Sequence, residues 1–515
     1  MRAALRDAAV ALSLANLSFI TVWSRLFDSP NIVEVGNVRT YLVGIVLNVL
    51  LLALALWVVV LGATRLQRPW ARRTMQWMFL LAVAVPLNGI RVQLTDLTVP
   101  ALAAPFGGGG TMAVGIALAA VAVGLLVRWQ DRVVAGIATV LLVCLPFVAV
   151  TFFHAARVLV RHETPRTVVE ERAGVRAPTE GPTQRVVWLL FDAMDYRLSF
   201  PERPRTVRLR ELDRLCGEGL CARNAFPPGG STAAAMPALI TGRRVAEVKP
   251  YYPGDMTVRF VGADRSVLWS SQPSVFSRAR ALGARGGVVG WYLPYCEVLG
   301  GTLTSCRMVS AGAASLPEVM GLQTETLIGT VPAVWRLGYR EGARQLRRHR
   351  ERGTRRYLDV LEAAREAAAR PDLDLLLVHW PIPHEAFIYD RFKDDFSLDA
   401  DPVAGYFDNL QLVDRTLGEV RRAMERAGVW ERTTVVVTAD HSWAESIALD
   451  GRRDYRVPFV LKLAGRRTPT AYDPPFNTLL LHGLILELLK GGLRDSTDVV
   501  RWLDRERGAV PVRRR

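Results

Sequence analysis

Acidic and histidine residues stand directly after apolar runs in the second half of the sequence. Asp192 follows the run 185–191, and the run 433–438 leads through one alanine into Asp440 and His441. Carboxylate oxygens and imidazole nitrogens are the ligands that Zn²⁺, Mn²⁺ and similar cations take from proteins. These residues therefore predict a site for one divalent cation, with Asp192, Asp440 and His441 as its ligands and the metal undetermined among Zn, Mn, Mg and Ca.

Two further histidines follow a third apolar run. His379 ends the run 373–379 and is followed by Pro-Ile-Pro and His384. We predict His384 as the group that donates a proton or hydrogen bond to a reacting oxygen, and His379 as a substrate contact or a support for the metal ligands. A single Asp after a strand is more often a helix cap or turn residue. Three strand ends that carry Asp or His favour a metal site instead.

Two hydroxyl side chains, Ser231 and Thr232, lie between the pair Gly229-Gly230 and an apolar run that is typical of a helix. A hydroxyl in this place ordinarily caps the helix. The same place suits chemistry, because a helix N-terminus attracts phosphate and a hydroxyl beside a divalent cation can attack phosphorus. The residues themselves leave open which hydroxyl reacts, or whether either does.

Apolar runs of strand length alternate with helical patterns after residue 184. This alternation predicts an α/β domain with a mostly parallel central sheet. Ligands of such sheets bind beyond the carboxyl ends of the strands, so the Asp and His residues above would meet at one edge. The runs read as strands are 185–191, 288–291, 373–379, 433–438 and 457–462, and the helical patterns are 354–370 and 403–428.

Five apolar runs of roughly bilayer-spanning length precede this domain. They predict a five-helix transmembrane domain, and a buried bundle of a soluble protein is the alternative, which the lack of polar faces disfavours. The runs are 7–25, 41–63, 74–93, 111–128 and 133–153. The full division is a transmembrane domain over 1–155, a linker over 156–183, a catalytic domain over 184–500 and a basic tail over 501–515.

The charges and cysteines indicate on which side of a membrane the domain lies. Arginines gather at 65–73 and 128–132, which predicts a cytoplasmic N-terminus and a catalytic domain on the outer, periplasmic or extracellular side. Cysteines in that domain would pair locally as Cys216–Cys221 and Cys296–Cys306, with four free thiols as the alternative. The net charge of +16 comes almost entirely from arginine, and we expect no nucleic-acid partner.

A basic segment at 344–356 carries seven of these arginines. Two interpretations remain open. The segment would either lie against anionic lipid headgroups or form a solvated basic face of a helix, which is the commoner case.

The order of these residues resembles the alkaline phosphatase superfamily. The closest likeness is to its sulfatase-like branch, which includes sulfatases, lipoteichoic acid synthases and lipid A phosphoethanolamine transferases. The resemblance covers roughly 184–465, and the segments 186–192, 231–243 and 435–441 carry it. Membrane spans before such a domain also resemble the synthases and transferases. The resemblance implies a metal-dependent enzyme that acts on a membrane lipid or an envelope glycan.

The resemblance also implies which hydroxyl reacts. The transferases carry Ser-Thr-Ala with Pro five residues after the nucleophilic Thr, which Thr232 and Pro237 match. Sulfatases place their Cys or Ser nine residues before the Thr of a Thr-Gly-Arg ending, and counting back from Thr241 again reaches Thr232. Sulfatases mature that Cys or Ser to formylglycine, a route closed to Thr. The resemblance thus implies a phospho-threonine intermediate, with Ser231, His379 and Arg243 as substrate contacts.

One departure bears on the number of metal ions. The transferases carry a further His shortly before a Pro, where this chain has Tyr455, so one cation is expected rather than two. The predicted function is a membrane-anchored enzyme that transfers or hydrolyses a phosphoryl or phosphodiester headgroup. A sulfuric-ester hydrolase of the same fold and a catalytically silent envelope assembly protein are the alternatives.

Overall fold

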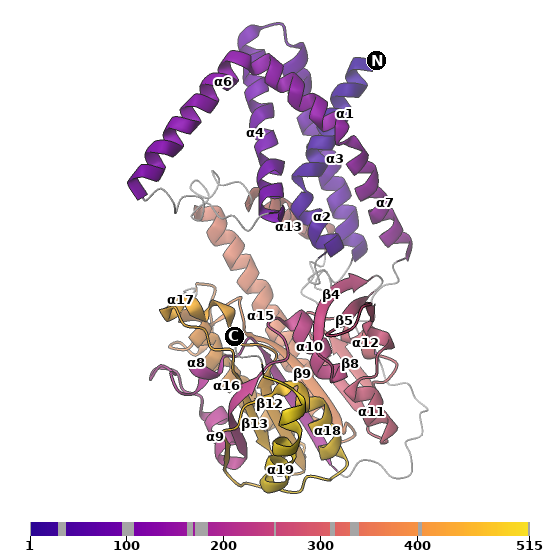
Figure 1. The fold of residues 1–515 in the computed structure, drawn as a ribbon, viewed down its shortest axis with the longest axis vertical. Helices are drawn as coiled ribbons and strands as arrows, with labels where there is room; N and C mark the ends of the chain where they lie inside the picture. Colours follow the sequence, from indigo (N-terminus) through magenta and orange to yellow (C-terminus); the bar gives the residue numbers. More distant parts are fainter. Residues whose placement is uncertain are drawn as a thin grey trace. The chain divides into compact units, whose positions relative to one another are not determined.

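The computed structural model describes residues 2–28, 38–94, 108–161, 168–169, 184–251, 254–309, 315–329, 339–399 and 404–512. The chain forms two compact units (Figure 1). The helical unit contains Met1–Ser29, Asn37–Glu163 and Ala313–Gly342. The α/β unit contains Pro30–Gly36, Thr164–Gly312 and Ala343–Arg515.

The helical unit is built from long apolar helices. Helices α1 and α3 pack against each other, and Arg65 Nη2 of α3 lies 2.8 Å from Asp7 Oδ2 of α1. Side-chain amides such as Gln76, which bonds Asp131 at 2.7 Å, also find partners inside the unit. The helices are α1 (Arg2–Ser18), α2 (Ile20–Asp28), α3 (Val38–Arg65), α4 (Pro69–Leu94), α6 (Gly108–Val143), α7 (Leu145–Arg161) and α13 (Leu316–Gly329).

Within the described residues, two helical stretches are long and apolar enough to cross a membrane, Arg39–Arg65 and Val127–Val160. The first matches the predicted span 41–63. The second contains the predicted span 133–153, and the predicted span 74–93 lies within the single helix α4. The predicted span 7–25 is divided at Phe19, between α1 and α2. Most of the predicted span 111–128 lies where no side chains are described. The five-span bundle is therefore not confirmed.

Helix α13 comes from the middle of the α/β sequence and packs inside the helical unit. The Asn48 side-chain amide of α3 donates to Gln323 Oε1 and to the Met320 carbonyl, both at 3.0 Å. Gln323 in turn donates to the Tyr41 carbonyl at 2.8 Å. The helices approach closely where α3 has Gly44, at which a Cβ would lie 3.0 Å from Val319. Sequence reasoning did not predict this return of the chain.

The α/β unit is organised around a ten-stranded sheet in the order β1-β8-β7-β9-β2-β12-β13-β3-β14, with β15 also pairing β3. The five strands from β8 to β12 are mutually parallel, which confirms the predicted mostly parallel sheet. The bounds are β1 (Val168–Val169), β8 (Ser305–Met308), β7 (Gly286–Gly290), β9 (Leu375–Pro383), β2 (Arg185–Asp192), β12 (Thr433–Ala439), β13 (Val457–Lys462), β3 (Leu220–Phe226), β14 (Thr470–Tyr472) and β15 (Phe476–Asn477).

Burial on both faces explains the continuous apolar runs of the central strands. Every residue of β2, β9 and β12 is buried, as in parallel sheets that helices cover on both sides. The larger helices that flank the sheet are α9 (Arg210–Glu218), α10 (Thr232–Thr241), α11 (Val275–Ala281), α15 (Tyr339–Ala369), α16 (Ala404–Arg426), α18 (Leu481–Leu489) and α19 (Ser496–Glu506). Short helices α8 (Tyr196–Ser199), α12 (Tyr295–Leu299) and α17 (Ile447–Asp450) lie in the connections.

Smaller elements complete the unit. The strands β4 (Val245–Tyr251), β5 (Asp255–Phe260) and β6 (Val267–Leu268) form a three-stranded antiparallel sheet, and β10 (Tyr389–Asp390) pairs with β11 (Asp395–Phe396). The 3-10 helices are η3 (Trp269–Ser271), η4 (Ala444–Ser446), η5 (Thr478–Leu480) and η6 (Arg507–Ala509).

Several predicted boundaries differ from the observed elements. Helix α7 continues to Arg161, and β1 lies inside the predicted linker 156–183, whose residues 162–167 and 170–183 are outside the described part. At the other end, α19 crosses the predicted boundary at 500 and buries Leu503, so residues 501–506 continue the packed unit and are not a separate tail. The run 457–462 is a strand as predicted, but β13 is antiparallel to β12.

Both predicted disulfides are present. Cys216 is bonded to Cys221, and Cys296 to Cys306, which ties α12 to β8. Cys144 in the helical unit is free. Two disulfides in the α/β unit fit an oxidising compartment.

Candidate active site

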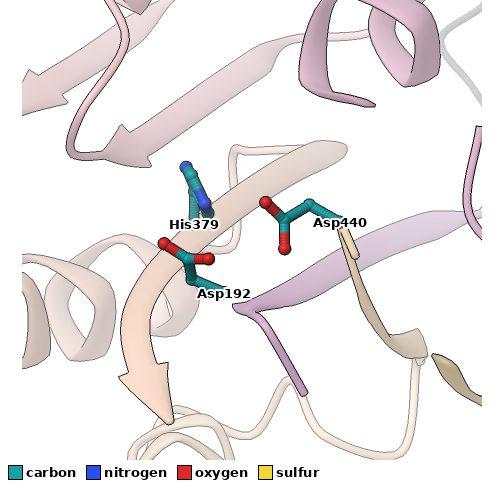
Figure 2. A group of neighbouring side chains, drawn as sticks. All are labelled: Asp192, His379 and Asp440. Carbon is teal, nitrogen blue, oxygen red and sulfur yellow. The ribbon is translucent and has the colours of Figure 1, made fainter. Parts of the chain in front are cut away.

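Three neighbouring parallel strands bring Asp192, His379 and Asp440 together (Figure 2). Asp192 is the last residue of β2, Asp440 follows β12 directly, and His379 lies in β9 opposite Leu190. One ligand atom from each of the three lies within 4.8 Å of the others. All three side chains are buried, so the structure gathers metal-competent groups in a dry site at the predicted edge of the sheet.

The N-terminus of α10 brings Thr232 to the same place. Its Oγ1 lies 3.4 Å from Asp192 Oδ1 and 3.3 Å from His441 Nε2. The turn before the helix lies close against the first turn of α10, because a Cβ at Gly229 would be 3.0 Å from the Ala235 nitrogen. Ser231 is the N-cap residue, but its exposed side chain makes no capping hydrogen bond. Of the two hydroxyls, only that of Thr232 contacts the acidic and histidine cluster.

His441 completes the cluster with its ring held in a defined orientation. Its Nδ1 lies 2.9 Å from the Ser442 carbonyl, and a hydrogen bond there places a proton on Nδ1, so that Nε2 is the nitrogen available to a cation. Nε2 is 3.3 Å from Asp192 Oδ1 and 3.6 Å from Asp440 Oδ2. Burial lowers the pKa of His441, but Asp440 and Asp192 outweigh burial and raise it to about 10. The two carboxylates therefore attract a positive charge to this point.

Two buried atoms in the cluster have no hydrogen-bond partner. Asp440 Oδ1 accepts from the Ala193 and His441 backbone N–H groups at 3.1 and 2.8 Å, whereas Oδ2 has none. His379 Nδ1 lies 2.9 Å from the Tyr295 hydroxyl, whereas Nε2 has none. A buried polar atom left unsatisfied costs about 1–3 kcal/mol.

The donor set accordingly fits one divalent cation. Burial and the charge of Asp192 raise the pKa of the Asp440 carboxyl, as expected when two carboxylates face each other without a cation between them. Two carboxylates and one imidazole, with a hydroxyl beside them, suit Zn²⁺, Mn²⁺ or Mg²⁺. His379 was predicted as a substrate contact or a support for the metal ligands, and one of its ring nitrogens lies within 4.8 Å of oxygens of both carboxylates.

His384 lies beside the cluster on the segment that follows β9. Its ring is half-buried and stands edge-on to His441, with the centroids 6.4 Å apart. The Asn409 side-chain amide donates to the His384 carbonyl at 3.1 Å and fixes the segment against α16. Burial lowers the pKa of His384, but the charge of Asp192 prevails and raises it. A protonated imidazole at this position suits donation to a leaving oxygen.

Arg243 is the predicted site residue that the structure does not bring to the cluster. It follows the C-cap residue Gly242 of α10, at the opposite end of the helix from Thr232. A helix of this length spans about 15 Å. The Arg243 guanidinium lies 3.8 Å above the Phe260 ring and is exposed, so its role as a substrate contact stays a prediction.

Sequence reasoning missed the residues that hold the site in place. Tyr295 of α12 bonds His379, and Tyr406 of α16 donates to the Ala193 carbonyl at 3.0 Å and accepts from the Asp195 N–H at 2.9 Å. Trp443 stacks on Tyr406 with the ring centroids 3.9 Å apart. Aromatic residues in apolar helices are ordinarily core residues, and nothing in their local sequence distinguishes these three.

We expect Asp195, which lies just beyond the cluster, to make the stability of the fold depend on pH. Its side chain is buried, and burial raises its pKa from 3.8 to about 7. The protonated carboxyl therefore stabilises the fold fully below pH 4, and this contribution disappears as the pH rises through 7. Asp195→Asn keeps the Oδ1 that accepts from the Leu198 N–H at 3.1 Å and cannot ionise. We expect it to raise the free energy of unfolding at pH 8 by about 2–4 kcal/mol relative to the wild type, and at pH 4 by almost nothing.

Thermal unfolding of the detergent-solubilised full chain, followed by tryptophan fluorescence, measures this difference. The midpoints of variant and wild type should separate by about 4–8 °C at pH 8 and coincide at pH 4. The control is Asp213→Asn, whose half-exposed carboxylate bonds Arg203. An equal gap at both pH values would contradict the account.

Comparison with known proteins supplies the family. The model of the type I phosphodiesterase / nucleotide pyrophosphatase family matches residues 186–450. No curated protein sequence matches the chain. Solved structures similar to this chain include the phosphonate monoester hydrolase of Agrobacterium radiobacter, at 14% identity and a TM-score of 0.39 over 59% of this chain and 73% of that chain. The corresponding enzyme of Silicibacter pomeroyi gives 13% identity and a TM-score of 0.38 over 60% and 73%.

A third structure, an alkaline phosphatase superfamily protein of Vibrio parahaemolyticus, gives 13% identity and a TM-score of 0.37 over 61% and 68%. The family match runs from the second residue of β2 to the last residue of α17 and therefore contains Asp192, Thr232, His384, Asp440 and His441. It covers just over half of the 515 residues. This chain belongs to the type I phosphodiesterase / nucleotide pyrophosphatase family.

Proposed function

We propose that this protein is a metal-dependent enzyme that cleaves a phosphodiester and uses Thr232 as its covalent nucleophile. The position of the Thr232 hydroxyl carries the proposal. It stands at a helix N-terminus, within 3.4 Å of both Asp192 Oδ1 and His441 Nε2. The free N–H groups of the first helical turn favour an anion at this point. A hydroxyl placed between an anion site and a metal site is suited to attack phosphorus.

The ligand set assigns a role to each residue of the cluster. Asp192, Asp440 and His441 would hold the cation together with Thr232 Oγ1, and His379 Nε2 faces the same point. A divalent cation bound there lowers the pKa of a coordinated hydroxyl and neutralises charge on phosphoryl oxygens. Tyr295 fixes the His379 ring through Nδ1.

The reaction then proceeds in two balanced steps. Thr232 Oγ1 gives up its proton to solvent and forms a bond to phosphorus, while the bond from phosphorus to the leaving alcohol breaks. Thr232 Oγ1 takes a proton back from solvent when the second step releases it. His384 donates a proton to the departing oxygen. In the second step an acceptor alcohol or water loses a proton to His384 and attacks phosphorus, which breaks the bond to Thr232. In-line placement of the diester by the α10 N-terminus supplies part of the rate.

The substrate that we propose is the headgroup of an envelope lipid or glycan. The helical unit supports a membrane-bound substrate, because two of its helical stretches have the length and hydropathy of membrane spans. The two disulfides support an outer location of the α/β unit.

A reporter enzyme that is active only outside the cytoplasm, fused after Val512, tests this topology. An inactive reporter on a stable fusion would place the unit inside the cell.

Transfer and hydrolysis share this site and differ in the second step. We propose transfer, because the membrane unit would hold donor and acceptor lipids in one plane. The experiment incubates the full chain with a fluorescent phosphodiester lipid, with and without mixed membrane lipids as acceptors. We expect labelled acceptor to form, and release of the free headgroup alone would make the enzyme a hydrolase.

The two alternatives from sequence have weaker support. A sulfuric-ester hydrolase of this fold needs formylglycine, and Thr232 occupies that position. In a catalytically silent assembly protein, two buried carboxylates that face each other would only destabilise the fold, since they repel each other when no cation lies between them.

A further inference from the structure

A cavity of about 460 Å³ opens in the α/β unit, outside the cluster described above. Its walls come from α8, from the end of β3 and from the segment that precedes β13. They include Arg197, Phe226, Arg453, Tyr455 and Arg456. A volume of this size falls within the range of small-ligand sites and accommodates a sugar phosphate.

The cavity lies at the same edge of the sheet as the metal-competent cluster. Strands β12 and β13 are antiparallel neighbours, so the residues that follow Ala439 and those that precede Val457 share one edge. The segments are also bonded to each other, because the Tyr196 N–H, four residues after Asp192, donates to the Arg456 carbonyl at 3.2 Å. The cavity and the cluster therefore open at the same edge of the sheet, on segments that are bonded to each other.

Three of the four arginines in the wall are neutralised by carboxylates. Arg197 is buried and bonds Glu202 at 2.9 Å and Asp450 at 2.6 Å. Arg452 bonds the same two carboxylates, each at 2.8 Å. Arg456 bonds Asp454 at 2.5 Å. These pairs form a fixed, charge-balanced wall.

The fourth arginine, Arg453, is not balanced. Within the part of the chain that the structure describes, its side chain makes no ion pair, and its Nε is shielded from solvent without a hydrogen-bond partner. The guanidinium lies 4.7 Å above the Tyr455 ring, which limits the directions in which it can point. The cavity thus presents one uncompensated guanidinium, a group that binds phosphate with two parallel hydrogen bonds.

We propose that this cavity is a second phosphate site, which holds a phosphate group of the substrate other than the one that reacts. Arg453 donates to that phosphate, and Tyr455 and Phe226 line the space for the sugar or glycerol unit that carries it. This inference rests on the proposed function, because it takes the reacting diester to be bound at Thr232. It narrows the substrate class to molecules that carry a second phosphate near the cleaved diester.

Paired substrates test the proposal on the full chain. One is methyl p-nitrophenyl phosphate, and the other is the p-nitrophenyl phosphodiester of glycerol 3-phosphate, which adds a second phosphate. We expect Arg453→Ala to lower kcat/KM about 10–100-fold for the second substrate and less than twofold for the first. The control is Arg466→Ala, an exposed arginine on the loop after β13. An equal effect on both substrates, or on neither, would overturn the proposal.

A binding measurement separates this site from the proposed chemistry. Inorganic pyrophosphate is titrated calorimetrically into metal-free full chain, so that the catalytic cluster contributes least. We expect binding that Arg453→Ala weakens at least about tenfold and that Arg453→Lys partly restores. If neither diester is cleaved but this binding pattern holds, the proposed function fails and the phosphate site stands. If pyrophosphate binds wild type and Arg453→Ala equally, the site itself is overturned.

Discussion

Replacing Thr232 by alanine should lower kcat for phosphodiester cleavage by at least about a thousandfold, because the Thr232 hydroxyl contacts both Asp192 and His441 and is the proposed nucleophile. The Thr232 side chain is buried, but alanine removes little volume and leaves the helical backbone intact. Thr232→Ser keeps the hydroxyl at the same place and should retain measurable turnover. Initial rates with a p-nitrophenyl phosphodiester, at saturating metal, give the comparison.

The neighbouring hydroxyl provides the matched control. Ser231 is exposed and makes no capping hydrogen bond, so Ser231→Ala should change the rate less than twofold. Metal content must be measured on each variant, since the carboxylates and imidazoles that remain should still bind the cation in Thr232→Ala. Full turnover by Thr232→Ala with normal metal content would contradict covalent catalysis at this residue.

Replacing Asp440 by asparagine should remove most of the bound metal. It should also reduce turnover by a factor comparable to that expected for Thr232→Ala. Asp440 is fully buried, and its Oδ2 faces His441 Nε2 at 3.6 Å with no hydrogen-bond partner. Asparagine can keep the two backbone N–H bonds at Oδ1, so the fold should persist while a charged ligand is lost. The metal content of the purified chain, measured by elemental analysis, should fall from about one ion per chain in the wild type to well below one in the variant.

The same variant has an opposite effect on the metal-free protein. Without a cation, Asp440 and Asp192 repel each other, and asparagine removes that repulsion. After dialysis against a chelator, Asp440→Asn should therefore unfold at a higher temperature than the wild type, whereas with metal it should unfold at a lower one. Asp213→Asn serves as the surface control. A variant that keeps its metal, or that is less stable in both states, would contradict the assignment of Asp440.

Sequence reasoning located the strand ends because buried parallel strands leave a strong pattern. The runs before Asp192 and Asp440 are apolar on both faces, and the carboxylates that follow them mark where each strand ends. Once β2 and β12 are neighbours in a parallel sheet, the chain has no freedom to separate these side chains. The helix start at Thr232 was equally readable from the glycine pair before it.

Other features depend on contacts between distant residues and leave no local pattern. Tyr295 supports His379 across 84 positions of sequence, and Gln323 pairs with Asn48 across 275. The position of Arg243 away from the cluster could not be predicted, because a spacing count places a residue along α10 and does not tell which end of the helix reaches the site. The count of five spans stays a prediction, since hydropathy does not reveal where a helix breaks, as the chain does at Phe19 and Cys144.

The direct test of the central claim is mass spectrometry of the wild-type chain after brief reaction with substrate and acid quenching. The account predicts an adduct on the peptide that contains Thr232, with the mass of the transferred phosphoryl group, absent from Thr232→Ala and unchanged in Ser231→Ala. An active enzyme with no adduct at Thr232 under these conditions, or with the adduct on Ser231, would contradict it.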